Sequence, residues 1–362
     1  MKLQLRTLHR WIGLSLLCVW LVQAATGVLM VFHWELDDAL LAAPSQPVSF
    51  DAIGQRVAAL AKERRHSHVL TVYPTGGAPD RFDIFVENAD GRSDVVRVDG
   101  AGRNVVTRPS NYDYAHAGLI NAAVILHQSF FAGDTGRRLL GASGLFLLIS
   151  LVFGVRLAWP GRGRWRSVLV PRGVRPGPGR WYAWHRAVGL WLAIPAAVFL
   201  TAGVLLAFDD PLEELLGAAP ARPTLVAAPA DAVPIGPAQA IATAIARFPG
   251  SSFSGLRMPS TEAAWYRVRV KQPGERRRVF GTTAVYVAAA GGAVLAVEDA
   301  HAVSWRRIFL DVAYPIHTGE YVGWPGRWVA LASGCLLLTS MTLGSLLWWR
   351  RRRPPSRIPV SG

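Results

Sequence analysis

The chain has 362 residues, of which 51% are hydrophobic and only 17% charged, and its formal net charge is +15. This composition is typical of a membrane protein that also has soluble parts. Only two cysteines are present, Cys18 and Cys335, and both lie within apolar stretches. The cysteine count therefore excludes a disulfide framework and a cysteine-ligated metal or iron–sulfur site.

Four stretches are long and apolar enough to cross a bilayer as helices, which takes about 20 residues each. The first stretch is an apolar run of 22 residues. This is too long for the h-region of a cleaved signal peptide, which has about 7–15 residues. We therefore expect a retained helix there. The four predicted spans are Trp11–Phe32, Leu139–Trp159, Ala187–Phe208 and Trp328–Trp349.

The positive charge is concentrated beside these spans. Eight arginines and no acids lie in Arg156–Arg186, and four consecutive arginines begin at Arg350. The positive-inside rule then predicts that both termini and the middle loop are cytoplasmic, with the long loops Glu35–Gly136 and Asp209–Gly326 outside. Arginines in this pattern indicate contact with the lipid bilayer and not with nucleic acid.

Each long loop has the pattern of one helix followed by four antiparallel strands separated by turn residues. The first loop predicts a helix over Ser49–Arg65 and strands over Val69–Tyr73, Arg81–Glu87, Asp94–Asp99 and Asn104–Thr107. The second predicts a helix over Pro237–Phe248 and strands over Ser254–Met258, Ala264–Lys271, Thr283–Ala288 and Ala293–Glu298.

The chain is an internal duplication. At an offset of 176, ten of 25 positions are identical between Leu8–Phe32 and Trp184–Phe208. At an offset of 190, 13 of 34 positions match between Leu126–Trp159 and Ile316–Trp349. Both copies begin on the same side of the membrane, which predicts a parallel repeat. The fold class that follows is an α-helical bundle of four transmembrane helices, duplicated 2+2, with two outer α+β modules.

This organisation predicts eight segments. They are transmembrane helix 1 (1–34), the first outer module (35–115), a histidine-bearing segment with helix 2 (116–160), a basic cytoplasmic loop (161–184), helix 3 (185–208), the second outer module (209–308), a histidine-bearing segment with helix 4 (309–350) and a basic cytoplasmic tail (351–362).

Four of the nine histidines are duplicated in register: His9 with His185, and His127 with His317. A single histidine at a helix end is commonly an interfacial anchor. Duplication instead places two imidazoles at equivalent positions about a pseudo-twofold axis, and a haem iron takes one nitrogen ligand from each face. We therefore expect an inner haem between the first pair and an outer haem between the second.

Other duplicated residues fit this hypothesis. Arg10, Arg186, Arg137 and Arg327 are candidates to bind the haem propionates. The duplicated glycines Gly13/Gly189, Gly27/Gly203, Gly144/Gly334 and Gly154/Gly344 are suited either to contact with a flat haem or to close helix packing.

Two alternatives for metal binding stay open. A zinc or copper site is the rival use of paired histidines, although two histidines alone make a weak zinc site. His33 lies at the outer end of the first span and is an alternative outer ligand. Its counterpart is Asp209, so the duplication does not support it.

The motifs also resemble a known family. His-Arg-x-x-Gly-Leu opens a helix at His9 and His185, Leu-His or Ile-His is followed by Gly-x-x-Gly-Arg before another helix, and α+β modules lie between them. This set resembles the PepSY-associated transmembrane proteins. Some members are bacterial inner-membrane, haem-containing reductases of ferric siderophores. The resemblance implies two PepSY-like periplasmic modules and haem b as cofactor.

Our main hypothesis is therefore an oxidoreductase of the ferric-chelate reductase type, which passes electrons across the membrane to a periplasmic ferric siderophore or other acceptor. No G-x-G-x-x-G fingerprint opens a helix after a strand, so the electron donor is expected to be a quinol or a separate reductase. The sequence assigns no catalytic residue. The alternative is a non-redox membrane scaffold or regulator whose modules bind a periplasmic peptide or protein partner.

Overall fold

A computed structural model describes residues 2–41, 43–63, 68–89, 91–110, 118–172, 174, 177–218, 232–261, 263–275, 277 and 280–352. The predicted tail 351–362 lies outside the described residues from position 353 onward. The chain forms two compact units, each assembled from separate stretches of sequence. The helical unit contains Met1–Val31, Leu126–Asp209 and Ile316–Gly362, and the sheet unit contains Phe32–Ile125 and Asp210–Pro315.

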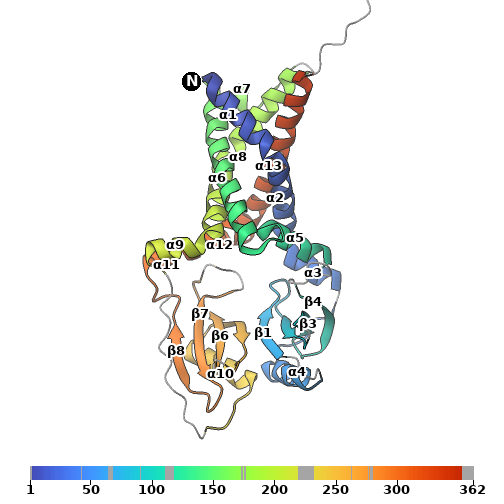
Figure 1. Ribbon diagram of the computed structural model, residues 1–362, viewed down its shortest axis with the longest axis vertical. Coiled ribbons are helices and arrows are strands. Elements are labelled where there is room, and N and C mark those ends of the chain that lie inside the picture. The colour runs from blue at the N-terminus through green and yellow to red at the C-terminus, as the bar shows by residue number, and fades with distance from the viewer. Residues whose placement is uncertain are drawn as a thin grey trace, which may run out of the picture. The chain divides into compact units, whose positions relative to one another are not determined.

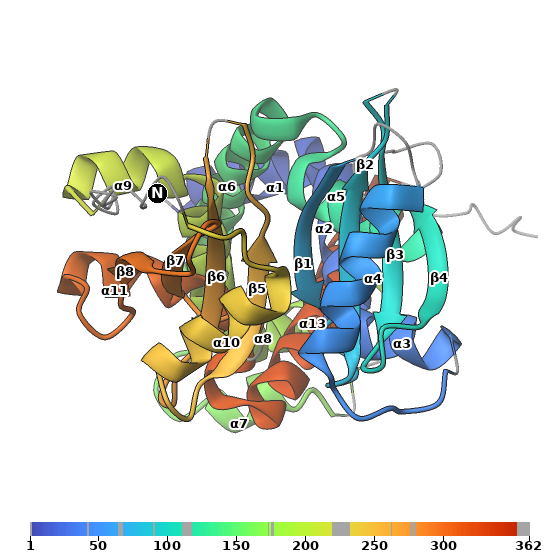
Figure 2. The same cartoon turned by 90° about the horizontal axis from the view of Figure 1, so that it is seen from below.

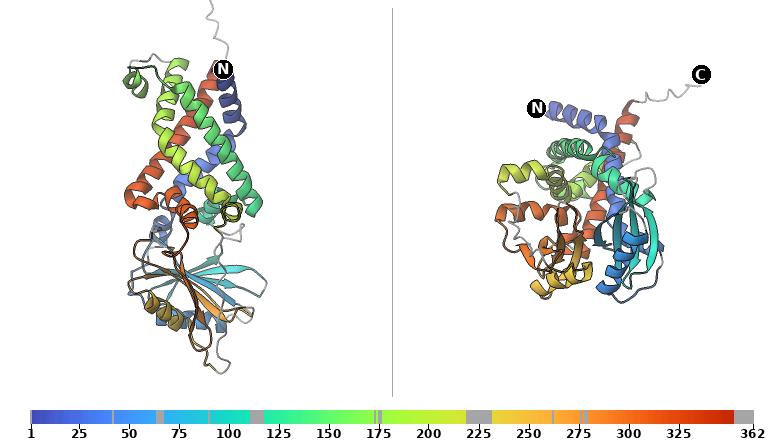
Figure 3. Two further views of the ribbon diagram at one scale, coloured as in Figure 1. Left: turned by 90° about the vertical axis from the view of Figure 1, so that its left-hand side faces the viewer. Right: turned by 60° about the horizontal axis from the view of Figure 1, so that its bottom comes forward.

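Long helices make up the helical unit, and Figures 1 and 3 show them running side by side and crossing one another. α8 packs against both α6 and α13, α1 packs against α6, and α2 packs against α13. The helices are α1 (Lys2–Ser15), α2 (Leu17–Met30), α6 (Gly133–Ala158), α7 (Trp165–Leu169), α8 (Pro178–Ala207) and α13 (Trp324–Arg352), together with the 3₁₀ turn η1 (Glu320–Val322).

Three of these helices, α6, α8 and α13, are long and apolar enough to cross a membrane, and a fourth span results if α1 and α2 count as one. The sequence predicts one continuous first span. The structure instead breaks it at Leu16, with a bend of 65° between the two helices. α8, its duplicate, stays a single helix even though Pro195 lies inside it.

Short helices precede α6 and α13 and carry the second pair of duplicated histidines. α5 (Gly118–Ser129) ends in a sharp turn in which Phe130, Phe131 and Gly133 all have positive φ. Two consecutive non-glycine residues in this region are uncommon. α12 (Ala313–His317) is followed by positive-φ residues at Gly319 and Gly323 before α13 begins. The boundary between the two units falls inside α5 and α12.

The sheet unit contains both outer modules. Each has one helix and four strands, as the sequence predicts, but the structure joins them in one eight-stranded antiparallel sheet ordered β4-β3-β2-β1-β5-β6-β7-β8. The strands are β1 (His68–Pro74), β2 (Arg81–Glu87), β3 (Ser93–Asp99), β4 (Asn104–Pro109), β5 (Ser252–Arg257), β6 (Trp265–Lys271), β7 (Thr283–Ala288) and β8 (Val294–Glu298).

The join is made by β1 and β5, where Val72 lies opposite Leu256. Both side chains are 1% exposed and belong to one hydrophobic core that continues through both modules. Helices α4 (Phe50–Glu63) and α10 (Pro237–Arg247) cover this core side by side, as Figure 2 shows. Further helices of the unit are α3 (His33–Leu41), α9 (Asp209–Leu216) and α11 (Trp305–Asp311).

Candidate functional site

The structure brings together the two histidine pairs that the duplication predicts. The ring centroids of His9 and His185 are 6.3 Å apart, with 42° between the ring planes. The ring centroids of His127 and His317 are 6.1 Å apart, with 34° between the planes. All four rings belong to the helical unit. His9 and His127 come from the first half of the duplication and His185 and His317 from the second, so each pair combines the two halves.

This spacing fits two ligands on opposite sides of one metal. Imidazole nitrogens bind metals such as zinc at about 2.0–2.1 Å, so two collinear imidazoles on one ion have ring centroids roughly 6.3 Å apart. Among the described residues, no group of three or more His, Cys, Asp or Glu side chains could hold a metal ion. A haem iron is one ion that binds a pair of imidazole ligands.

A hydrogen bond to a helix carbonyl holds each ring of the inner pair. His9 Nδ1 donates to the carbonyl of Ser150, at 2.9 Å, and His185 Nδ1 donates to the carbonyl of Ser340, at 2.9 Å. The serine hydroxyls lie 3.0 Å and 3.4 Å from the same nitrogens. Because a carbonyl oxygen only accepts, the proton is on Nδ1, and Nε2 is the nitrogen with a lone pair.

The outer pair repeats this arrangement. His317 Nδ1 donates to the carbonyl of Phe199, at 2.9 Å, and His127 Nδ1 donates to the carbonyl of Gln23, at 3.1 Å. The side-chain amide of Gln23 in turn donates to the carbonyl of His127, at 3.1 Å. Helix α2 thus holds His127 through both its ring and its backbone carbonyl. Again Nε2 is left as the nitrogen able to bind a metal.

Four duplicated glycines make room for the rings. An added Cβ would lie 3.1 Å from Cε1 of His9 at Gly154 and 3.1 Å from Cε1 of His185 at Gly344. At Gly27 the distance to Cε1 of His127 would be 3.0 Å, and at Gly203 the distance to Cε1 of His317 would be 2.7 Å. Each glycine follows by four residues the carbonyl that accepts from the same ring, so one helical turn supplies both the gap and the acceptor.

Sequence reasoning singled out these glycines but assigned them to a haem face or to helix packing. It did not find the acceptor positions. A signal was present for the inner pair, because Ser150 and Ser340 are duplicated four residues before Gly154 and Gly344. No such signal marks the outer pair, since Gln23 corresponds to Phe199 and the interaction uses the backbone.

A cavity of about 570 Å³ adjoins the inner pair, within the usual size range of ligand sites. Its lining includes His9, His185, Gly13 and Gly189. An added Cβ at either of these two glycines would have no atom within 4 Å, so both face open space. This is the arrangement expected where a flat apolar group approaches a helix. Trp20, only 4% exposed, lines the same cavity.

The four predicted arginines fall into two classes. Arg10 and Arg186 line the cavity beside the inner pair, where they could meet an anionic group. Nε of Arg186 also donates to the carbonyl of Ala158, at 2.8 Å. Arg137 instead forms ion pairs with Asp209 and Asp134. Arg327 is 2% exposed, donates to the carbonyl of Val31 at 2.6 Å and lies over the ring of Trp324. The structure thus gives Arg137 and Arg327 partners within the helical unit.

The alternative outer ligand, His33, lies in the sheet unit, with its ring centroid 4.9 Å from that of Trp34. The pairing seen in the helical unit is the one between His127 and His317.

A group of long apolar helices, together with a unit built on an antiparallel sheet, defines a membrane protein. The chain belongs to the family described as PepSY-associated TM region, whose model matches residues 6–351, nearly the whole length. No protein with curated annotation matches the chain.

Proposed function

We propose that this chain is a bacterial inner-membrane haem b protein that passes electrons across the membrane to a periplasmic ferric chelate of the siderophore type. The observation that carries this proposal is the spacing of the two histidine pairs, 6.3 Å and 6.1 Å between ring centroids. At this spacing the two histidines of each pair could together hold the iron of one haem, and the spacing occurs twice.

Bound haem would supply one-electron exchange at two places along the bundle. The chain's own contribution is to hold four imidazoles in one tautomer, with Nδ1–H bonded to a helix carbonyl and Nε2 available as ligand. Arg10 and Arg186 are suited to pair with carboxylates at the inner site. Leucine side chains and Trp20 make up much of the remaining lining of the cavity beside the inner pair.

The proposed topology has four spans, with α1 and α2 acting as one, and both termini in the cytoplasm. The sheet unit then lies in the periplasm. In this arrangement His9 and His185 are near the cytoplasmic side, where a quinol or a separate reductase would deliver electrons. His127 and His317 are near the periplasmic side, where the acceptor would be reduced.

Single histidine substitutions test the proposal. We expect His9→Ala and His185→Ala each to remove the same b-type haem and to leave the other in place, because either change deletes one of two axial ligands. His127→Ala and His317→Ala should remove the other haem. Reduced-minus-oxidised visible spectra and haem quantitation would measure this, with His301→Ala, at an exposed position of the sheet unit, as the matched control.

If His33→Ala removes a haem and His127→Ala does not, the outer pairing is wrong. If the wild-type protein binds no haem after expression with adequate haem supply, the redox proposal fails, and the scaffold hypothesis takes its place.

A further inference from the structure

The face of the sheet opposite α4 and α10 carries arginine side chains that are partly buried. Along β6 the side chains alternate, so that Tyr266, Val268 and Val270 enter the core beneath α10, while Arg267 and Arg269 lie on the other face. Two guanidinium groups on one strand, two residues apart, repel each other unless each has an anionic partner. Their partners therefore indicate what this face is built to bind.

Arg267 has such partners. Its Nη2 donates to Glu298 at 2.9 Å, and its Nε donates to the hydroxyl of Tyr286 at 3.0 Å. The hydroxyl of Tyr286 donates in turn to Glu298, at 2.8 Å. The charge of Arg267 is thus balanced within the sheet.

Arg269 has no carboxylate partner among the described residues. Its hydrogen bond is to the backbone carbonyl of Gly281, at 2.6 Å, and its Nε is buried without an acceptor in this part of the chain. The nearby carboxylate of Glu275 accepts instead from the backbone amides of Gln272 and Thr282. Burial is the largest effect on the pKa of Arg269 and lowers it. Tyr73 and the carboxylate of Glu275 raise this pKa, while the positive charges of Arg267 and Arg277 lower it.

Arg277 is the second under-compensated cation. Its nearest carboxylate is Asp311, at 3.8 Å, which also pairs with Arg307 at 3.0 Å. The Nε of Arg277 is also buried without an acceptor among the described residues. Its guanidinium lies over the ring of Tyr314, 5.1 Å from the centroid. Arg307 also pairs with a second carboxylate, Glu213, whereas Asp311 is the carboxylate nearest to Arg277 among the described residues.

Aromatic rings adjoin these cations. Gly255 lies opposite Arg269 in the β5–β6 ladder, and the ring of Tyr73 covers it so closely that a Cβ at Gly255 would lie 2.5 Å from Tyr73 Cε1. The ring of Phe280 is next to Tyr73, 6.2 Å between centroids at 79°. Trp34 is next to Phe280, at 5.6 Å. The glycine thus brings an aromatic cluster against the arginine that lacks a carboxylate.

We propose that Arg269 and Arg277, with Tyr73 and Phe280, bind a negatively charged iron chelate whose ligands are aromatic, of the catecholate type. This inference rests on the proposed function, from which it takes iron as the metal of the chelate. Guanidinium groups bind anionic oxygens through charge-assisted hydrogen bonds, and flat rings pack on Tyr and Phe. A cationic chelate, such as a positively charged trihydroxamate, would be repelled by the same two arginines.

Binding of a redox-inert analogue tests the site. A gallium(III) tris-catecholate should bind the full-length protein in lipid nanodiscs, measured by calorimetry, and a cationic gallium trihydroxamate should bind much more weakly. Arg269→Gln and Arg277→Gln should each weaken catecholate binding about tenfold or more, since each removes charge-assisted hydrogen bonds. Arg247→Gln, on α10 and exposed, is the matched control and should change nothing.

Tyr73→Leu keeps both arginines and removes the ring, so weaker binding there would support the aromatic contact even if Arg269→Gln folds poorly. Unchanged binding in all three variants, or a preference for the cationic chelate, would overturn the inference. The haem spectrum is a separate readout. If the protein contains haem but does not bind the chelate, only the chelate site is disproved. If the protein binds the chelate but contains no haem, only the electron-transfer proposal is disproved.

Discussion

The histidine rings fit against the neighbouring helices because glycine has no Cβ atom at the points of contact. At each of the four positions the ring occupies the space where a side chain would stand on the neighbouring helix, so glycine is required for packing and not for backbone freedom. The four duplicated glycine pairs of the sequence thus belong to three groups. Gly27, Gly203, Gly154 and Gly344 receive imidazoles, and Gly13 and Gly189 face the cavity. Gly144 and Gly334 pack closely against valines of neighbouring helices, Val204 and Val28.

The closest contact gives the sharpest prediction at this scale. Gly203→Ala places a methyl group 2.7 Å from Cε1 of His317, so the ring must shift. We expect overpacking of about 1–3 kcal/mol and loss of the outer bis-histidine signal in the electron paramagnetic resonance spectrum, with the inner signal retained. Gly179→Ala, on the same helix with no atom within 4 Å, is the control. An unchanged outer signal in Gly203→Ala would contradict the packing described here.

Hydropathy predicted where the helices are but not how they bend. The break at Leu16 contains no proline, and Pro195 leaves α8 continuous. α1 packs on α6 and α2 packs on α13, but α8 packs on the same two helices without a break, so these contacts alone do not explain the bend. Length predicts a turn between His127 and the following span, because one continuous helix from His127 to Trp159 would be about 48 Å long, too long for one crossing. The left-handed Phe130 and Phe131 could not be predicted, as local propensity disfavours them.

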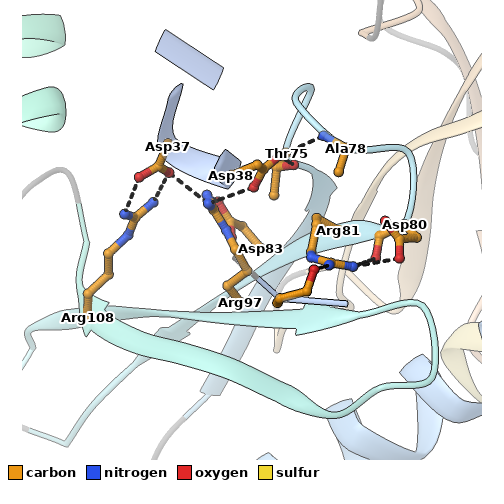
Figure 4. A network of polar contacts seen from close by, with 10 residues as sticks. Asp37, Asp38, Thr75, Ala78, Asp80, Arg81, Asp83, Arg97 and Arg108 are labelled. Atoms are coloured by element: carbon orange, nitrogen blue, oxygen red, sulfur yellow. Dashed lines mark hydrogen bonds and ion pairs between the residues drawn. The ribbon is translucent and has the colours of Figure 1, made fainter. Parts of the chain in front are cut away.

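In the sheet unit, an ion-pair network fixes α3 to the sheet, as Figure 4 shows. Arg97, whose side chain is 4% exposed, pairs with Asp37 at 2.7 Å, Asp38 at 3.0 Å and Asp83 at 2.7 Å. Asp37 also pairs with Arg108, at 2.7 Å. Three acidic side chains from α3 and β2 thus surround one buried guanidinium. Removing it would leave those carboxylates near one another without their shared cation.

We therefore expect Arg97→Met to destabilise the attachment of α3 by about 3–5 kcal/mol, the usual cost of breaking a buried pair. Hydrogen exchange in α3 and β3, followed by mass spectrometry, would measure it. Arg56→Gln, which removes the partly exposed pair with Glu63, should cost only about 0.2–1 kcal/mol. Equal effects of the two substitutions would show that the network does not hold α3.

The same network predicts a pH dependence. Burial alone would raise the pKa of Asp37, but hydrogen bonds and charges from Arg108 and Arg97 outweigh it, so the pKa lies below its ordinary value of 3.8. A lowered folded-state pKa means that this stabilisation is fully present above about pH 4 and is lost as the pH falls through the folded-state value. The protection factors of the α3 amides, which correct for the intrinsic exchange rate at each pH, should therefore fall below pH 4 in the wild type. In Arg97→Met, where one of the two cations is missing, that fall should begin at a higher pH.

At the scale of the whole molecule, the duplication could be predicted from sequence and the joining of the two modules could not. Each module has a complete pattern of one helix and four strands, so nothing local signals that β1 and β5 pair. The pairing becomes favourable because Val72 and Leu256 extend one core beneath α4 and α10. The histidine pairs were predictable for a related reason, since a repeated residue type in register carries information about symmetry that composition does not.

Membrane orientation is tested by cysteine labelling. In a background with Cys18→Ala and Cys335→Ala, we expect Lys62→Cys and Ala246→Cys, both exposed on the sheet unit, to react with an impermeant thiol reagent added to spheroplasts. Ser167→Cys, exposed on α7, should react only after lysis. Labelling of Ser167→Cys in intact spheroplasts would show that the orientation is the opposite of the proposed one, and that the proposed direction of electron flow is wrong.

The most direct measurement of the central claim is haem stoichiometry in the purified full-length protein, by pyridine haemochrome quantitation together with a dithionite-reduced difference spectrum. Two bis-histidine pairs predict two b-type haems for each chain, both low-spin. A colourless protein, or one whose haem content is unchanged in His9→Ala, His185→Ala, His127→Ala and His317→Ala, would contradict it.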